Sequence, residues 1–163
     1  MSNEKGKAVL ELAIVAPFFL ILVIGLVDIA FIIRKQQHLS VSLREAGNAA
    51  YRQCYTTVEG RSTNICLQNS AQEALSFVDN NGGVIDGAKL IVRSWKVSGS
   101  NPTLAGEYST GQEVSRFNSN RIGNLHSYRS GLKKTIITVE GYLDNTESNI
   151  PFFSRKLYDA DIF

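Results

Sequence analysis

Apolar residues are concentrated near the amino end of the chain, in a pattern that leaves no polar face. Residues 12–27 carry no charge, and the wider apolar segment 8–33 is interrupted only by Glu11 and Asp28. As a helix the wider segment would be roughly 39 Å long, more than the ~30 Å hydrocarbon core of a bilayer. A helix that is apolar all round fits lipid better than water, so the pattern predicts a single transmembrane helix.

The helical pattern continues beyond the apolar segment, because no helix breaker follows it. An apolar stripe with spacings of four, three and four residues is formed by Leu39, Leu43, Ala46 and Ala50. We therefore expect the helix to run on into water until about Cys54. The small residues of the stripe allow two interpretations: close packing against a helix of another molecule, or packing on the globular part of the same chain.

The remaining residues predict a small α+β head with an antiparallel sheet. Residues 67–79 have helical spacing, whereas residues 88–97 and 134–143 alternate and are rich in β-formers, which indicates strands. A last short strand is expected within residues 151–163. Residues 99–124 are rich in turn-forming residues and are expected to be mostly loop.

Length and charge limit the function classes. The 163 residues suffice for one modest domain, and the formal net charge is only +2, too weak and dispersed for a nucleic-acid surface. Basic residues flank the apolar segment on both sides, so charge alone does not orient the helix in a membrane. The sequence has no P-loop, no GxGxxG and no GxSxG neighbourhood, and we expect no enzyme, no catalytic residues and no cofactor.

The two cysteines, Cys54 and Cys66, can close a short loop over residues 55–66 in an oxidising compartment. Such a disulfide would contribute about 3 kcal/mol in the chain-entropy account. Two unpaired thiols are the alternative. A metal site is not expected, because neither His38 nor His126 has ligand spacing to the cysteine pair.

Glu11 is the costly residue of the apolar segment. A carboxylate at the centre of a bilayer costs on the order of 2.5–3.5 kcal/mol and usually has a partner, although near a helix end it can reach the interface. A short polar leader, residues 1–6, ends in Gly6, and the glutamate stands five positions after that glycine. A cleaved secretory signal explains this less well, because the apolar core is long and no small-x-small site follows it promptly.

This arrangement resembles the class III signal of type IV-like prepilins, in which a membrane peptidase cuts after the glycine. The resemblance implies cleavage between Gly6 and Lys7, which would leave a new ammonium group about 6 Å along the helix from Glu11. In a bundle of such helices the glutamate can pair with the ammonium of a neighbouring molecule. Any other axial offset would leave a carboxylate unpaired in apolar surroundings, so the pair would set the register.

The first third of the chain further resembles the TadE-like family, the minor pseudopilins of tight-adherence (Flp-type) pili. The match covers roughly residues 6–52 and rests on Glu11, Val15-Ala16-Pro17, Gly25 with Asp28, Gln36-Gln37 and the segment 44–50. The sequence departs from the family pattern at Leu12, where an aromatic residue is usual, at Asp28, where Glu is usual, and at Lys7, where type IV pilins carry Phe.

Two other residues of the segment have an expected role. Pro17 cannot donate a hydrogen bond to the carbonyl of Ala13, so we expect a looser or kinked helix there, as in pilin-like helices. Asp28 lies about 25 Å from Glu11 along a helix, near the far interface, where hydration or screening by Arg34 and nearby Lys35 would suffice. A second pairing between molecules at Asp28 is a hypothesis.

The resemblance implies a pilin-like organisation: a leader (1–6), a transmembrane helix (7–33), a helical extension (34–53) and a periplasmic head (54–163). It implies a bacterial inner-membrane protein with a cytoplasmic amino end. After leader cleavage the protein would assist the biogenesis or initiation of an adhesive pilus, as part of the filament or as its primer. Its partners would be the major pilin, a sister minor pseudopilin, the inner-membrane assembly platform, a prepilin peptidase and membrane lipid, with no nucleic acid. The alternatives are a type II secretion-like pseudopilin and an uncleaved membrane-anchored binding module.

Overall fold

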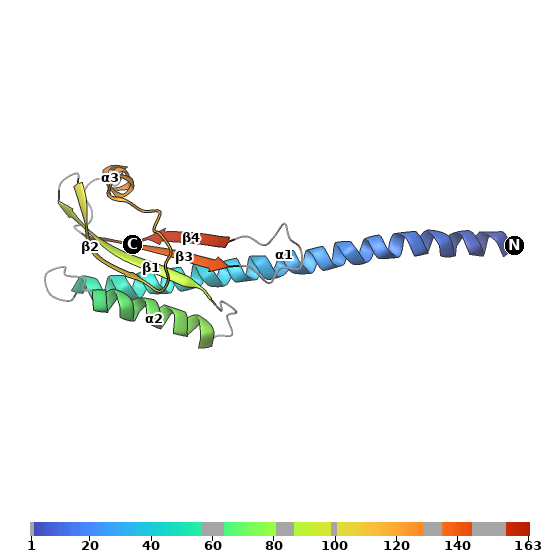
Figure 1. The fold of residues 1–163 in the computed structure, drawn as a ribbon, viewed down its shortest axis with the longest axis horizontal. Coiled ribbons are helices and arrows are strands. Elements are labelled where there is room, and N and C mark those ends of the chain that lie inside the picture. The colour runs from blue at the N-terminus through green and yellow to red at the C-terminus, as the bar shows by residue number, and fades with distance from the viewer. Residues whose placement is uncertain (1, 57–63, 81–86, 99–100, 129–134, 145–155) are drawn as a thin grey trace.

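A computed structural model describes residues 2–56, 64–80, 87–98, 101–128, 135–144 and 156–163 of the chain. Its elements in chain order are α1 (Ser2–Thr56), α2 (Asn64–Asn80), β1 (Lys89–Ser98), β2 (Asn101–Ser109), α3 (Ser119–Tyr128), β3 (Thr135–Asp144) and β4 (Lys156–Ile162). Figure 1 shows a long single helix with a small head gathered around its carboxyl-terminal half. The fold is therefore α+β with a long amino-terminal helix, as the sequence predicts.

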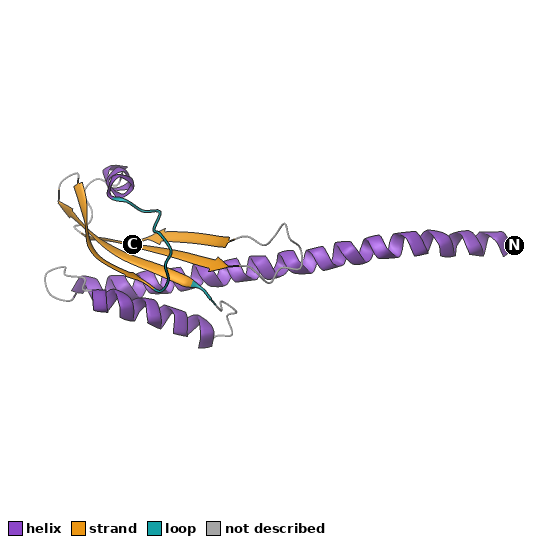
Figure 2. Ribbon diagram, viewed as in Figure 1, coloured by secondary structure: helices purple, strands orange, loops and turns teal. Residues whose placement is uncertain are grey.

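The head is a four-stranded sheet with helices on both faces. The strand order is β2-β1-β3-β4 and every pair is antiparallel. Val92 of β1 lies opposite Val139 of β3, and Val139 lies opposite Asp161 of β4. Figure 2 shows α1 and α2 along one face of the sheet, and α3 with the loop that precedes it on the other. The central strand β3 is buried along its whole length apart from Asp144.

The main core lies between the helices and the sheet. Its buried members are Leu39, Leu43, Ala46, Ala50 and Cys54 from α1, Leu67, Ala71 and Ala74 from α2, and Leu90, Val92, Ile137, Val139 and Leu143 from the sheet. The predicted stripe of α1 therefore packs on the chain's own head. Its small residues bring the helix close to the sheet, and a Cβ at Gly141 of β3 would lie 2.8 Å from a methyl carbon of Leu39.

A smaller core fills the opposite face of the sheet. Trp95 and Ile136 from the strands meet Phe117 and Ile122 from the segment that crosses this face. The Trp95 indole N–H donates a hydrogen bond to the Thr138 hydroxyl at 3.0 Å, which satisfies its one buried polar atom. The head consequently has one apolar core on each face of its single sheet.

Strand β4 runs alongside α1 in the same direction. The Gln36 amide donates to the carbonyl of Tyr158 at 3.4 Å, and the Phe163 ring lies against Gly47, where a Cβ would approach it to 1.9 Å. Eleven residues of helix and five residues of strand both span about 16 Å, so the two contacts are mutually consistent. The free edge of β4 is thereby fastened to the helix.

The prediction that residues 99–124 are mostly loop was wrong, because this segment contains β2 and the start of α3. β2 is an edge strand. At a sheet edge the lack of an N–H group in Pro102 is tolerated, and so are the other turn-forming residues of β2. α3 is preceded by Asn118, whose side-chain oxygen accepts the Arg121 N–H at 2.8 Å and caps the helix. Burial of Ile122 against the sheet then stabilises a helix of otherwise polar sequence.

The other element bounds differ in detail from the predictions. α1 ends at Thr56, and α2 begins at Asn64, so the predicted loop 55–66 is helical at both ends, while residues 57–63 lie outside the described part of the chain. The last strand is present as Lys156–Ile162, and residues 151–155 lie outside the described residues. α1 already includes Ser2, so residues 2–6 of the expected leader have helical backbone.

Candidate functional site

The most unusual surface of the molecule is the amino-terminal part of α1, residues 9–33, which we call the stalk. Every Val, Leu, Ile and Phe of the stalk except Ile32 is exposed, with exposed fractions from 39% at Ile29 to 71% at Ile21. Within the described residues, α1 is the one helix long and apolar enough to cross a membrane. An apolar surface of this extent cannot stay in water, so the stalk requires lipid or other helices around it.

Glu11 lies near the amino end of the stalk and is exposed. None of the described residues forms a hydrogen bond or ion pair with its carboxylate. The described residues therefore supply no partner for this carboxylate, which would need one in an apolar medium.

The predicted processing site, Gly6 and Lys7, lies within the helical backbone of α1. The side chains of residues 1–8 lie outside the described part of the structure. The role of both residues stays a prediction from the sequence.

Pro17 stands inside α1, and helical backbone continues on both sides of it. Because proline has no N–H, the carbonyl one turn earlier lacks its usual helical donor there.

Asp28 differs from Glu11 in its surroundings. It is half-buried, and its Oδ2 atom is buried with no hydrogen-bond partner in the described part of the structure. Ile32 and Lys35 follow at helical spacing and are also half-buried, on the side of the helix that carries Leu39. The side chains on this side of α1 are thus partly buried from Asp28 onward.

Cys54 and Cys66 form a disulfide with a Cα–Cα distance of 5.7 Å, which joins the end of α1 to the first turn of α2. Cys54 is buried in the main core, and Cys66 is half-buried beside it. The bond holds the two helices together at this end of the main core. Disulfides persist in oxidising compartments, so this bond favours a head outside the cytosol.

One polar site on the outer face of the sheet was missed by the sequence interpretation. Glu140 of β3 is 1% exposed. Its carboxylate accepts hydrogen bonds from the Arg116 backbone N–H at 2.8 Å, from the hydroxyls of Tyr142 and Tyr158 at 3.2 Å each, and from the Ser115 hydroxyl. The only hint in the sequence was a glutamate inside a largely apolar strand, and two of its four donors, Ser115 and Arg116, come from a segment that pattern analysis assigned to loop.

The bonds to Glu140 hold residues 110–118 across the sheet. The Tyr142 hydroxyl also contacts the Val114 carbonyl at 3.0 Å, and the Arg116 guanidinium lies 3.9 Å from the centre of the Tyr158 ring. Burial, followed by the nearby Glu140 charge, raises the pKa of Tyr142 to about 12 and raises the pKa of Tyr158 further. Both phenols therefore stay protonated and act as hydrogen-bond donors to Glu140.

A second charged group lies beside this cluster. Glu113 accepts hydrogen bonds from Lys156 at 2.6 Å and Lys89 at 3.3 Å, and both lysines also approach Asp144. The hydrogen bond from Lys156 lowers the pKa of Glu113, and the bond to Asp144 raises the pKa of Lys89. In the described part of the chain, no group of three His, Cys, Asp or Glu side chains converges as metal ligands.

Comparison with known protein families finds a match, over residues 6–48, to a family described as TadE-like protein. The resemblance predicted from the sequence is thereby confirmed for the stalk and the first part of the helix beneath the head. No curated protein and no solved structure matches the chain significantly. The family indicates involvement in a tight-adherence pilus system and is not a known enzyme family, and the long apolar helix indicates a membrane anchor.

Proposed function

We propose that this protein is a single-pass minor pseudopilin that assists the initiation or assembly of a Flp-type, tight-adherence pilus. The observation that carries the proposal is an exposed apolar stalk, matched by the TadE-like family, with Glu11 near its amino end and no partner for it among the described residues. In this proposal a prepilin peptidase removes residues 1–6. Glu11 then pairs with the new Lys7 ammonium of a neighbouring helix.

The proposed orientation places the amino end in the bacterial cytoplasm, residues 7–33 in the inner membrane, the extension 34–53 above it, and residues 54–163 in the periplasm. The Cys54–Cys66 disulfide supports this orientation, because an oxidising compartment maintains such bonds. The proposed partners are the major pilin, a sister minor pseudopilin, the assembly platform and the peptidase. A secretion-type pseudopilin would share the processing step, whereas an uncleaved anchored module would not.

The test is the mass and amino-terminal sequence of the protein coexpressed with its prepilin peptidase, beside Gly6→Ala as a variant that blocks the cut. A product that begins at Lys7 in the wild type and is absent in the variant would support the pseudopilin class. A chain that keeps residues 1–6 in both cases would refute it and leave an ordinary membrane anchor.

The role of Glu11 is tested separately, on chains that are already processed. Glu11→Gln keeps the shape of the side chain but removes its charge, and Glu45→Gln, on the exposed face of α1 beneath the head, is the matched control. We expect Glu11→Gln to be cleaved normally and to lose cross-linking to other pilins, while the control keeps it. Normal cross-linking in Glu11→Gln would refute the pairing and leave the processing result intact.

A further inference from the structure

The peptide bond between Gly6 and Lys7, which the proposed function assigns to a peptidase, lies inside the helical backbone of α1. The helix begins at Ser2, so this bond lies within its first two turns. In an α-helix each N–H group donates to the carbonyl four residues earlier. The Gly6 carbonyl therefore accepts a hydrogen bond from Leu10, and the Lys7 N–H donates one to Asn3.

Hydrolysis of this bond needs access to both of its ends. Water has to attack the carbonyl carbon of Gly6, the carbon–nitrogen bond breaks, and the nitrogen of Lys7 takes up a proton, which leaves a carboxylate and an ammonium group. In the closed helix the carbonyl points along the helix axis and the next turn of backbone flanks it. The peptide bond is therefore shielded as long as the helix stays closed.

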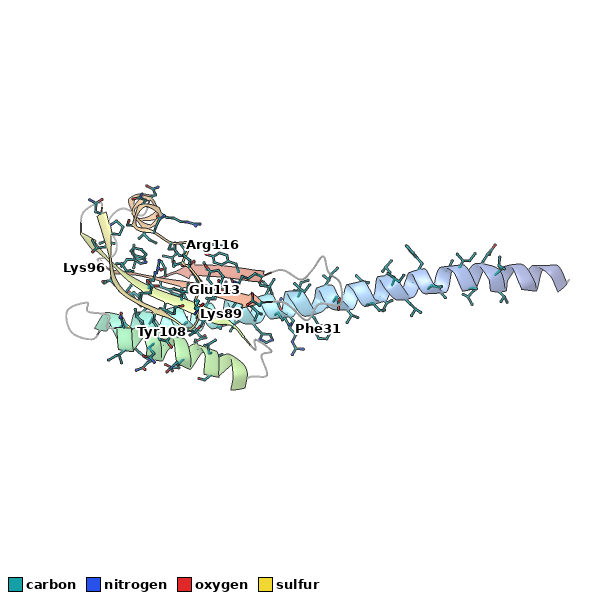
Figure 3. The ribbon with its side chains drawn as sticks, in the orientation of Figure 1. Phe31, Lys89, Lys96, Tyr108, Glu113 and Arg116 are labelled. Carbon is teal, nitrogen blue, oxygen red and sulfur yellow. A yellow bond between two sulfur atoms is a disulfide. The ribbon has the colours of Figure 1, made fainter. Side chains whose placement is uncertain are left out.

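The described parts of the head give the first turns of α1 no packing support. Every residue from 9 to 24 is exposed, so the described head elements do not pack against this part of the helix. Figure 3 shows Lys89 and Arg116 of the head beyond Phe31, with the amino-terminal part of α1 projecting away from them. A short helical segment without packing partners is marginally stable in water, so residues 2–6 can leave the helix readily.

The composition of the chain changes close to the cut. Residues 2–6 are polar, whereas residues 8–33 are apolar apart from Glu11 and Asp28. In water the carbonyl groups that leave a helix bond to solvent, but in lipid an unbonded backbone group is costly. We therefore expect opening from the amino end of the helix to stop near Lys7.

We propose that α1 opens over residues 2–6 before the peptidase cuts, and that the stability of the helix in this leader sets the rate of processing. The inference rests on the proposed function, because it concerns the cut after Gly6. Opening to this point releases the Gly6 carbonyl from Leu10 and leaves a helix that begins at Lys7, which is also the first residue of the processed chain. When opening is fast relative to cleavage, the rate of proteolysis follows the population of the open form.

The test compares alanine with glycine at two positions of the leader, because these two small residues differ in helix propensity. Asn3→Ala and Asn3→Gly both remove the amide side chain, and Lys5→Ala and Lys5→Gly both remove the ammonium group. Purified full-length chains in detergent micelles are cut by the purified prepilin peptidase, and kcat/KM is measured for the loss of residues 1–6. We expect each glycine variant to be cut about fivefold faster than its alanine partner.

Amide hydrogen exchange of the same chains, without the peptidase, measures the opening itself. The amide of Lys7 should exchange about fivefold faster in each glycine variant than in its alanine partner, because its bond to Asn3 is lost on opening. Ala30→Gly is the matched control, since it makes the same exchange of residues at an exposed position of the stalk, far beyond the leader. It should change neither the cleavage of the chain nor the exchange at Lys7.

The outcomes separate this inference from the proposed function. Equal cleavage within each pair, with exchange at Lys7 changed as expected, would overturn the inference and leave the pseudopilin class standing. An effect of glycine at only Asn3 or only Lys5 would also overturn it, because a local contact with the peptidase would then explain the rates. A wild-type chain that keeps residues 1–6 would refute the proposed function and this inference with it.

Discussion

Gly47 of α1 packs closely against Phe163, the residue that follows β4, and this contact depends on the absence of a side chain at Gly47. A Cβ at this position would lie 1.9 Å from Cε2 of the Phe163 ring and 2.3 Å from Cδ2 and Cζ. Ordinary carbon contacts are about 3.5–4.0 Å, so in Gly47→Ala the ring has to move by roughly 2 Å. Phe163 is also tied to β3, because its N–H and carbonyl bond to Ile137 at 2.8 and 3.0 Å.

Two opposing effects set the magnitude for Gly47→Ala. Overpacking of a core typically costs about 1–3 kcal/mol, whereas replacing glycine by alanine inside a helix contributes about 1 kcal/mol of stability. In the wild-type background we therefore expect a net loss of about 1 kcal/mol. In a Phe163→Ala background the clash is absent, and the same substitution should stabilise the head by about 1 kcal/mol.

The assay is denaturant unfolding of the full chain in detergent micelles, followed by fluorescence of Trp95, the single tryptophan, which is buried in the smaller core of the head. The double-mutant cycle should give a coupling energy of about 1–3 kcal/mol between positions 47 and 163. If Gly47→Ala has the same effect in both backgrounds within about 0.5 kcal/mol, the proposed clash is not what requires glycine here.

Three other outcomes are expected in the same unfolding assay. Replacing Cys54 and Cys66 together by alanine should cost about 3 kcal/mol, because the bond closes a loop of 12 residues in the unfolded chain, and an unchanged midpoint would contradict this. Because Tyr142 has its pKa raised from 10 to about 12 in the folded head, the unfolded chain loses this proton first as pH rises, and this group alone should lower the stability by about 1 kcal/mol between pH 9 and pH 11. In Tyr142→Phe this part of the alkaline loss should disappear, and parallel curves for the two proteins would refute the assignment. Asn118→Ala should cost about 1 kcal/mol through loss of the α3 cap, whereas Asn118→Asp should retain most of the stability, and equal losses in both would argue against capping.

Patterns within single segments of the sequence were sufficient to predict the elements whose structure depends on the local spacing of apolar residues. The continuation of the helix to near Cys54 and the strands near residues 88–97 and 134–143 were predicted close to their observed bounds. Each depends on the spacing of apolar residues within one element, and a helix repeats every 3.6 residues while a strand repeats every two.

Tertiary structure alone decided the features that depend on pairing between distant segments. β2 is a strand because β1 offers its edge, and α3 forms because Asn118 caps it and the sheet buries Ile122. Glu140 is stable as a buried carboxylate only because the segment 110–118 and two tyrosines bring donors to it from up to 25 residues away. These contacts depend on how the strands are ordered and aligned. Periodicity within a single segment does not encode that arrangement, so the head's polar sites became visible only in the folded structure.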